Sequence, residues 1–194
     1  MEPTATAEVI PAAITDPVQE IQDFDRVVER YWPRVLRYVL AAVHDADTAE
    51  TLTQDCFWKA YKGRNGFRGE SSLHTWLMHI AVNLVRDHTR SRRYQFWKRA
   101  AQNAVDHKTA HNWLPDRSIS PEQRASINEQ VQAVWKATKD LSERQRTVFV
   151  LRFVEDMIPA EIAEATGMTE NAVNVHLFRA VRAIRKRLKG AAEK

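Results

Sequence analysis

The sequence predicts an all-α protein in which two small helical domains are joined by a linker. Apolar residues recur at helical spacing in two separate stretches, glycine is scarce at 5 of 194 residues, and helix-capping patterns precede several of the apolar stretches. We expect a flexible acidic tail at residues 1–20, a first domain at 21–99, a linker at 100–119 and a second domain at 120–190. The hydrophobic content of 44% supports cores in both domains.

The first domain is expected to contain several amphipathic helices. Apolar side chains repeat at i, i+3, i+4 and i+7 over residues 24–44, where Pro33 either starts a new helix or kinks the old one. A further helix is predicted for residues 48–62, with five inward-facing residues, Leu52, Cys56, Phe57, Ala60 and Tyr61. After a loop with three glycines, another helix begins near Ser72, a residue type that commonly caps helix N-termini.

The second domain shows clearer start and stop signals. Ser120 and Gln123 form a predicted capping box, and Ser142 and Gln145 form a second one. A short helix over residues 159–166 should end at Gly167, and the following basic helix should run over residues 170–188. Two helices joined by a short turn with glycine are the helix-turn-helix pattern, whose second helix enters the DNA major groove.

Charge is distributed unevenly along the chain. Residues 1–29 carry seven acids and one base, residues 86–99 carry six bases and one acid, and residues 171–194 carry seven bases and one acid. Two basic stretches are consistent either with solvated helix faces or with two contacts to a polyanion such as DNA. The helix-turn-helix pattern ahead of the second stretch favours DNA.

Other classes of protein have little support in the sequence. There is no apolar run long enough to insert into a membrane and no signal-peptide pattern, so we expect a cytoplasmic protein. Cys56 is the only cysteine, and we expect it to be a packing residue and not a redox switch. His107 and His111 lack carboxylate or cysteine neighbours, and the three glycines lack the context of a nucleotide loop. We therefore expect no metal, no cofactor and no enzymatic activity.

Three segments, in this order and at this spacing, resemble the extracytoplasmic-function group of bacterial RNA polymerase sigma factors. The core-binding helix of that family is similar to DADTAETLTQDCFWKAY. Its −10-reading segment is similar to FRGESSLHTWLMHIAVNLVRDHTRSRR. Its −35-reading domain is similar to LSERQRTVFVLRFVEDMIPAEIAEATGMTENAVNVHLFRAVRAIRKRL.

The resemblance implies a sigma region 2 helical bundle, a sigma region 4 helix-turn-helix domain, and three sets of contact residues. Contacts with core polymerase, through the clamp helices of its largest subunit, are expected at Gln54, Asp55 and Phe57. The expected −10 surface consists of Asn83, Arg86, Asp87, Arg90, Arg92 and Arg93. The expected −35 surface consists of Asn171, Asn174, Val175, His176, Phe178, Arg179 and Arg182. Promoter DNA, core polymerase and an anti-sigma factor are the implied partners.

Two other functions stay open on the sequence alone. A stand-alone transcriptional regulator would share the helix-turn-helix but would need a sensor or dimerisation domain before it. An enzyme acting on nucleic acid would need paired carboxylates, a His/Cys cluster or a nucleotide loop, and the sequence shows none of these patterns. Binding to core polymerase separates the sigma factor from the regulator.

Overall fold

The computed structural model describes residues 16–91 and 134–192, with side chains up to residue 189, and within these ranges it contains helices and no strands. The chain order is α1 (Pro17–Glu20), α2 (Phe24–Val43), α3 (Ala46–Gly63), the 3-10 turn η1 (Arg64–Gly66), α4 (Leu73–Arg90), α7 (Glu143–Phe153), α8 (Pro159–Thr166) and α9 (Glu170–Ala192). Residues 134–138 are also helical. The all-α class is confirmed. The predicted tail, the linker and the capping box at Ser120 fall largely or wholly outside the described residues.

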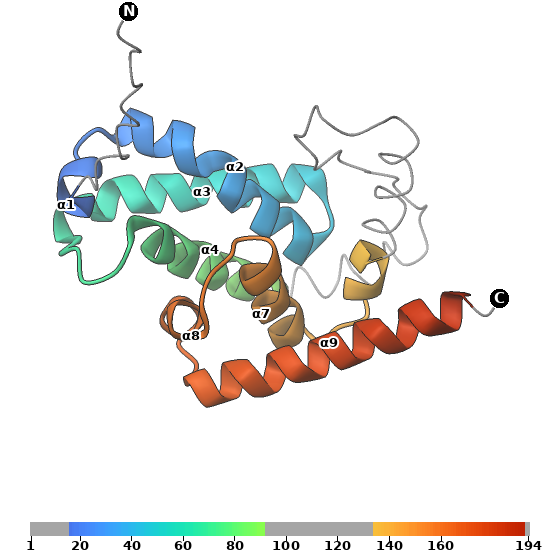
Figure 1. Cartoon of the computed structure of the whole chain (residues 1–194). Coiled ribbons are helices and arrows are strands. Elements are labelled where there is room, and N and C mark those ends of the chain that lie inside the picture. The colour runs from blue at the N-terminus through green and yellow to red at the C-terminus, as the bar shows by residue number, and fades with distance from the viewer. Residues whose placement is uncertain (1–15, 92–133, 193–194) are drawn as a thin grey trace, which may run out of the picture.

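The N-terminal unit is built from α2, α3 and α4, which lie side by side in the upper part of Figure 1. Pro33 lies inside α2 and does not end it, so residues 24–43 form one helix. Val27, Val35 and Tyr38 line the buried face of this helix. The prediction that Tyr61 faces inward is wrong, because this residue is 41% exposed near the end of α3, where its ring forms an edge contact with Phe24.

The predicted caps form as expected wherever the structure describes them. Ser72 Oγ accepts a hydrogen bond from the Thr75 amide at 3.0 Å, and Ser142 and Gln145 form a reciprocal capping box. Gly167 ends α8 in the left-handed region, with φ of 70° and ψ of 20°. Glycine adopts this conformation without the steric cost of a Cβ atom, so the chain turns sharply into α9.

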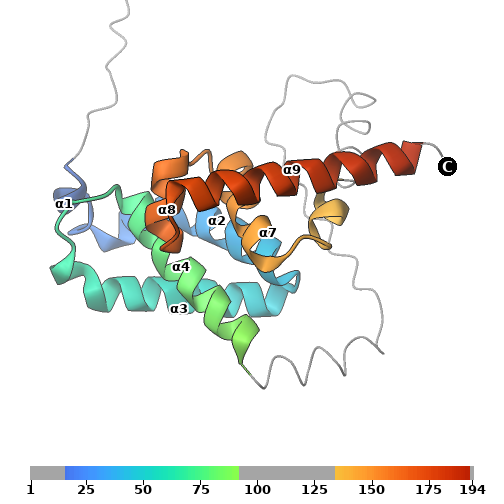
Figure 2. The same cartoon turned by 90° about the horizontal axis from the view of Figure 1, so that it is seen from below.

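The C-terminal unit consists of α7, α8 and α9, and it packs directly against the N-terminal unit. Helix α8 contacts α4, and α7 contacts α2, while the long α9 runs along the outer edge (Figures 1 and 2). Val148, Leu151 and Ile162 of the C-terminal unit belong to the same apolar cluster as the core of α2, α3 and α4. The sequence predicted both units, but it did not predict this shared core. We call this arrangement the closed state.

Candidate nucleic-acid interface

One exposed surface lies on α3. Asp45 caps this helix through a 2.8 Å hydrogen bond from the Thr48 amide, and one face of α3, which includes Leu52 and Cys56, is buried in the core. Gln54 and Asp55 are exposed, as their predicted role requires. Phe57 is not part of this surface, because it is 5% exposed and stacks on Trp32 with ring centroids 5.4 Å apart. It supports the surface from beneath, in the inward position that the helical repeat predicts for it.

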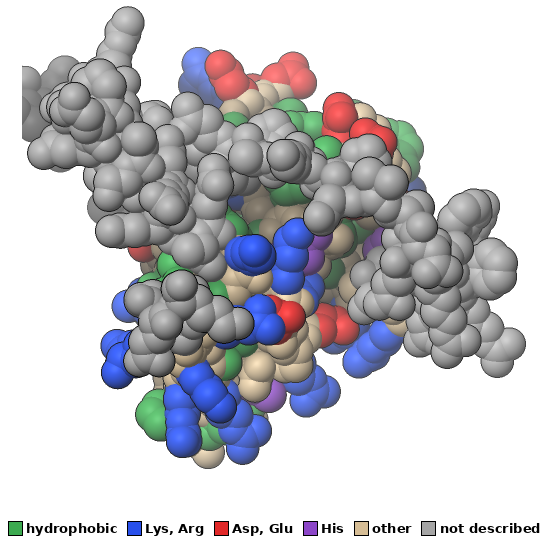
Figure 3. Space-filling model, turned by 90° about the vertical axis from the view of Figure 1, so that its right-hand side faces the viewer, with side chains coloured by type: hydrophobic (Ala, Val, Ile, Leu, Met, Phe, Trp, Pro, Cys, Tyr) green, Lys and Arg blue, Asp and Glu red, His purple; other side chains and the backbone are tan. Residues whose placement is uncertain are grey.

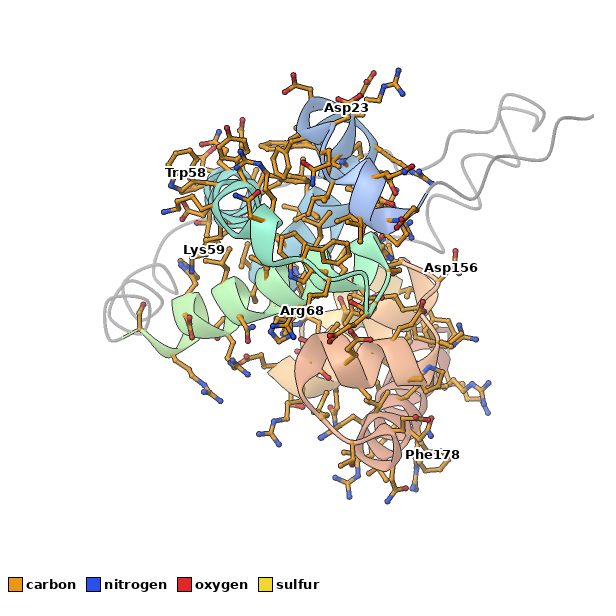
Figure 4. All side chains as sticks on the ribbon, turned by 90° about the vertical axis from the view of Figure 1, so that its left-hand side faces the viewer. Asp23, Trp58, Lys59, Arg68, Asp156 and Phe178 are labelled. Atoms are coloured by element: carbon orange, nitrogen blue, oxygen red, sulfur yellow. The ribbon has the colours of Figure 1, made fainter. Side chains whose placement is uncertain are left out.

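The same surface carries an aromatic residue that sequence reasoning missed. Trp58 is 58% exposed and stacks on Tyr61 with ring centroids 6.2 Å apart. Lys62 Nζ lies 5.1 Å from the centre of the Trp58 ring, within the range of a cation–π contact. Trp58 follows Gln54 by one helical turn, and this spacing is the sequence signal that places both on one face. Figure 4 shows Trp58 and Lys59 projecting outward from α3.

A second surface lies on the C-terminal half of α4, where Asn83 takes part in a chain of hydrogen bonds. His79 Nδ1 lies 3.1 Å from the backbone oxygen of Ala165 in α8, so this nitrogen donates to that carbonyl. His79 Nε2 then accepts from Asn83 Nδ2 at 3.0 Å, and Asn83 Oδ1 accepts from Arg86. In the closed state both ends of the Asn83 amide are therefore occupied by the protein itself.

The other residues predicted on α4 surround Asn83. Arg86 is half-buried, and its Nε is buried without a hydrogen bond. Asp87 and Arg90 are exposed. Arg92 and Arg93, which were also predicted for this surface, lie outside the described residues.

A third surface lies on α9. Thr169 caps the helix by accepting a 3.2 Å hydrogen bond from the Ala172 amide, and Val173 packs inward. The exposed face contains six of the seven predicted residues, namely Asn171, Asn174, Val175, Phe178, Arg179 and Arg182. Phe178 is 68% exposed and projects away from the body of the molecule (Figure 4). An exposed phenylalanine flanked by amide and guanidinium groups suits the base edges and methyl groups of the major groove.

His176, the seventh residue predicted on α9, is only half-buried, and its Nδ1 is buried without a hydrogen bond. Burial lowers the pKa of His176 below its ordinary value, and the charges of Arg144 and Arg179 lower it further. His176 is therefore neutral at neutral pH in the free chain. The positive charge of α9 comes instead from its arginines and lysines, which gather on the lower half of the surface in Figure 3.

The described residues contain no group of three metal-ligating side chains. Cys56 is fully buried, with Sγ 3.6 Å from the backbone oxygen of Leu77, and burial raises the pKa of its thiol to about 12. In the part of the chain that the structure describes, no helix is both long and apolar enough to cross a membrane.

Comparison with known proteins identifies the two units separately. Residues 27–94 match the family described as Sigma-70 region 2, and residues 132–184 match the family described as Sigma-70, region 4. The first match contains most of α2 and all of α3 and α4, and the second contains α7, α8 and most of α9. The chain is therefore matched by both families in the order in which the two units occur.

Whole-length relatives agree with these matches. The chain is 32% identical to the RNA polymerase sigma-H factor of Pseudomonas aeruginosa over 170 residues, which cover 85% of this chain and 86% of the relative. It is 29% identical to the ECF RNA polymerase sigma-E factor of Escherichia coli strain K12, over 83% of this chain and 84% of the relative. The ECF RNA polymerase sigma factor SigW of Bacillus subtilis is 24% identical, over 86% and 89%.

Two solved structures share the fold. The sigma factor RpoE of Bartonella quintana, solved with the anti-sigma factor NepR, superposes with a TM-score of 0.64 at 22% identity, over 87% of this chain and 98% of that one. CnrH, solved with the cytosolic domain of CnrY, superposes with a TM-score of 0.60 at 20% identity, over 88% and 90%.

Proposed function

The chain belongs to the extracytoplasmic-function group of the sigma-70 family of RNA polymerase sigma factors, and we propose that it directs core polymerase to promoters through three separate surfaces. The polymerase supplies the chemistry of RNA synthesis, so the chain is an initiation factor and needs no catalytic site of its own. It acts where polymerase and DNA meet, in the bacterial cytoplasm.

The first surface is the exposed face of α3, which we assign to core polymerase. Gln54 and Asp55 offer an amide and a carboxylate to the clamp helices of the largest subunit. Trp58 adds a large exposed ring beside them. Aromatic residues with a polar surround are typical of the residues that contribute most of the binding energy in protein interfaces.

The second surface is the C-terminal half of α4, which we assign to the −10 element. An asparagine amide can hydrogen-bond the edge of an unstacked base, and this is the role of Asn83 once its own partners release it. Arg86 and Arg90 lie on the same helix, where their charges suit the DNA backbone.

The third surface is the exposed face of α9, which we assign to the −35 element. Asn174 and Arg179 can read base edges, Phe178 and Val175 can contact thymine methyl groups, and Arg182 lies one turn further along for phosphate contact. Asn171 is at the N-terminal end of this face, the part of a recognition helix that approaches the bases most closely.

We also propose that an anti-sigma factor binds this chain. Support comes from the two structural relatives, because RpoE was solved with the anti-sigma factor NepR and CnrH was solved with the cytosolic domain of CnrY. The stand-alone regulator is the weaker alternative, because the N-terminal unit matches sigma region 2 and leaves no separate sensor domain in residues 27–94.

The observation that carries the proposal is the presence of two polar reading surfaces, on α4 and α9, in units matched by sigma regions 2 and 4. The test is to mix the purified chain with core RNA polymerase and measure binding and transcription on fragmented genomic DNA. The proposal predicts a complex with core polymerase and discrete transcript starts. A chain that binds palindromic DNA as a dimer but ignores core polymerase would be a regulator.

A further inference from the structure

The contact between the two units contains a fully buried carboxylate. Glu155 lies in the loop between α7 and α8, and its side chain has no exposed surface. Arg34 Nε donates to its Oε2 at 3.0 Å, Arg37 Nε donates to its Oε1 at 3.1 Å, and His74 Nε2 lies 3.5 Å from Oε2. All three partners belong to the N-terminal unit, on α2 and α4. Glu155 is therefore the centre of an ion cluster that joins the units.

The loop holds Glu155 in place for this contact. The Glu155 amide donates to the backbone oxygen of Val150 at 3.2 Å, and the Met157 amide donates to that of Leu151 at 3.0 Å. Arg34 Nη2 also donates to the backbone oxygen of Glu155 at 2.9 Å, so one arginine hydrogen-bonds both the side chain and the backbone of Glu155. A buried carboxylate is stable only when such partners replace its water.

The pKa of Glu155 agrees with this geometry. Burial alone would raise it, but the contacts from His74, Arg37 and Arg34 outweigh burial and hold the pKa below its ordinary value. The carboxylate is therefore charged at neutral pH, and its ion pairs with Arg34 and Arg37 join full charges.

Two further hydrogen bonds join the units. Arg146 of α7 donates to the backbone oxygen of Ala42, at the C-terminal end of α2, at 2.9 Å. His79 donates to Ala165 at 3.1 Å and accepts from Asn83. Asn83, the residue assigned to the −10 base, is thus linked to the C-terminal unit through His79, while its own hydrogen-bond partners, His79 and Arg86, both lie on α4. The α3 and α9 surfaces stay exposed in the same state.

The closed state is too short to read both promoter elements at once. The −35 and −10 elements are numbered by their positions upstream of the transcript start, so they lie about 25 base pairs apart. This separation is about 85 Å along B-form DNA. Asn174 follows Ala165 by nine residues, and Ala165 is joined to Asn83 through His79. Since a chain extends by at most about 3.6 Å per residue, Asn83 and Asn174 lie no more than about 50 Å apart. The units must separate before both elements are read.

We infer that Glu155, together with Arg34, Arg37 and His74, is an intramolecular latch that keeps the free chain closed and so prevents α4 and α9 from reading the two promoter elements at once. The effect of the latch on promoter recognition rests on the proposed function. The closure of the free chain by the latch does not depend on that function. The exposed α3 surface leaves the closed chain able to meet core polymerase, and separation of the units then removes the contact between His79 and Ala165 and lets the α4 and α9 surfaces move apart. When the units separate, water hydrates Glu155 and the two arginines. A substitution that removes one member of the cluster leaves its partners without a counter-charge in the closed state, so it favours the open state.

The test is single-molecule energy transfer on the free full-length chain. Donor and acceptor dyes are placed on cysteines introduced at the exposed positions Asn65 and Ala183, one in each unit. Buried Cys56 is left unlabelled. The latch predicts one high-transfer population, and Glu155→Gln should raise the ratio of open to closed molecules on the order of tenfold or more.

Matched variants keep the result interpretable. Glu164→Gln makes the same chemical change at an exposed position of α8 and should leave the transfer unchanged. Arg37→Gln breaks the cluster from the other unit and should open the chain like Glu155→Gln, with circular dichroism reporting intact helices. If only one of Glu155→Gln and Arg37→Gln keeps its helical structure, that variant alone is sufficient to test the latch.

Two outcomes would overturn the latch. One is a wild-type chain that is already mostly in the low-transfer state. The other is a transfer distribution that is the same for Glu155→Gln, Arg37→Gln and the wild type. The measurement uses neither polymerase nor DNA. A chain that opens as predicted but directs no transcription would therefore refute the proposed function and leave the latch standing.

Discussion

Replacing Phe178 by alanine removes the most exposed large apolar side chain of α9. Its side chain is 68% exposed in the free chain, so the substitution takes little from the folded core. A phenylalanine offers roughly 150 to 200 Å² of surface, which leaves about 120 Å² available to DNA. If the groove covers half of this area, burial at about 25 cal/mol per Å² contributes about 1.5 kcal/mol. We therefore expect Phe178→Ala to weaken −35 binding by about tenfold.

The assay is equilibrium binding of the polymerase holoenzyme to a promoter fragment, measured by fluorescence anisotropy with the wild-type chain and each variant. Phe153 supplies a matched control, because it is a 54% exposed phenylalanine in the same unit but lies on α7. Phe153→Ala should leave promoter affinity unchanged. Equal affinities for wild type and Phe178→Ala, or equal losses for the two variants, would refute the assignment of this α9 face to DNA.

Three more predictions follow from the surfaces and the core. Asn83→Ala should reduce open-complex formation roughly ten- to a hundredfold in a permanganate footprint while sparing core binding; normal promoter opening would contradict its −10 role. Trp58→Ala should weaken core binding several-fold in a titration, because its ring is 58% exposed beside Gln54, and an unchanged affinity would remove it from that surface. Cys56 should resist iodoacetamide at pH 7.5 until the chain unfolds, because its thiol is buried and has a pKa of about 12; rapid alkylation of the native chain would contradict this.

Much of the fold could be predicted because its signals are local. Ser72, Ser142 and Gly167 each specify a helix end through hydrogen bonds or backbone geometry within a few residues, and all three behave as expected. The exposure of Tyr61 could not be predicted by periodicity, because the helical repeat does not show that its position near the end of α3 is left partly uncovered. Only the folded chain shows where a helix loses its packing partner.

The candidate surfaces were predictable to different degrees. The exposed face of α9 follows from the helical repeat once Val173 is known to face inward. The burial of Phe57 agrees with the helical repeat of α3, which placed it inward, whereas the repeat did not predict that Trp58 is an exposed contact residue. The contact between Glu155 and Arg34 joins residues 121 positions apart, and no local pattern predicts such a pair.

The central claim is that α4 and α9 read two different promoter elements. The most direct measurement is to map transcript starts on fragmented genomic DNA with holoenzymes carrying the wild-type chain or Arg179→Ala. The wild-type starts should share a −35 block and a −10 block. The variant should relax the base preference in the −35 block, at a cost of about 1–3 kcal/mol at one position, and keep the −10 block. Blocks that are unchanged in the variant, or starts with no shared −35 block in the wild type, would contradict the claim.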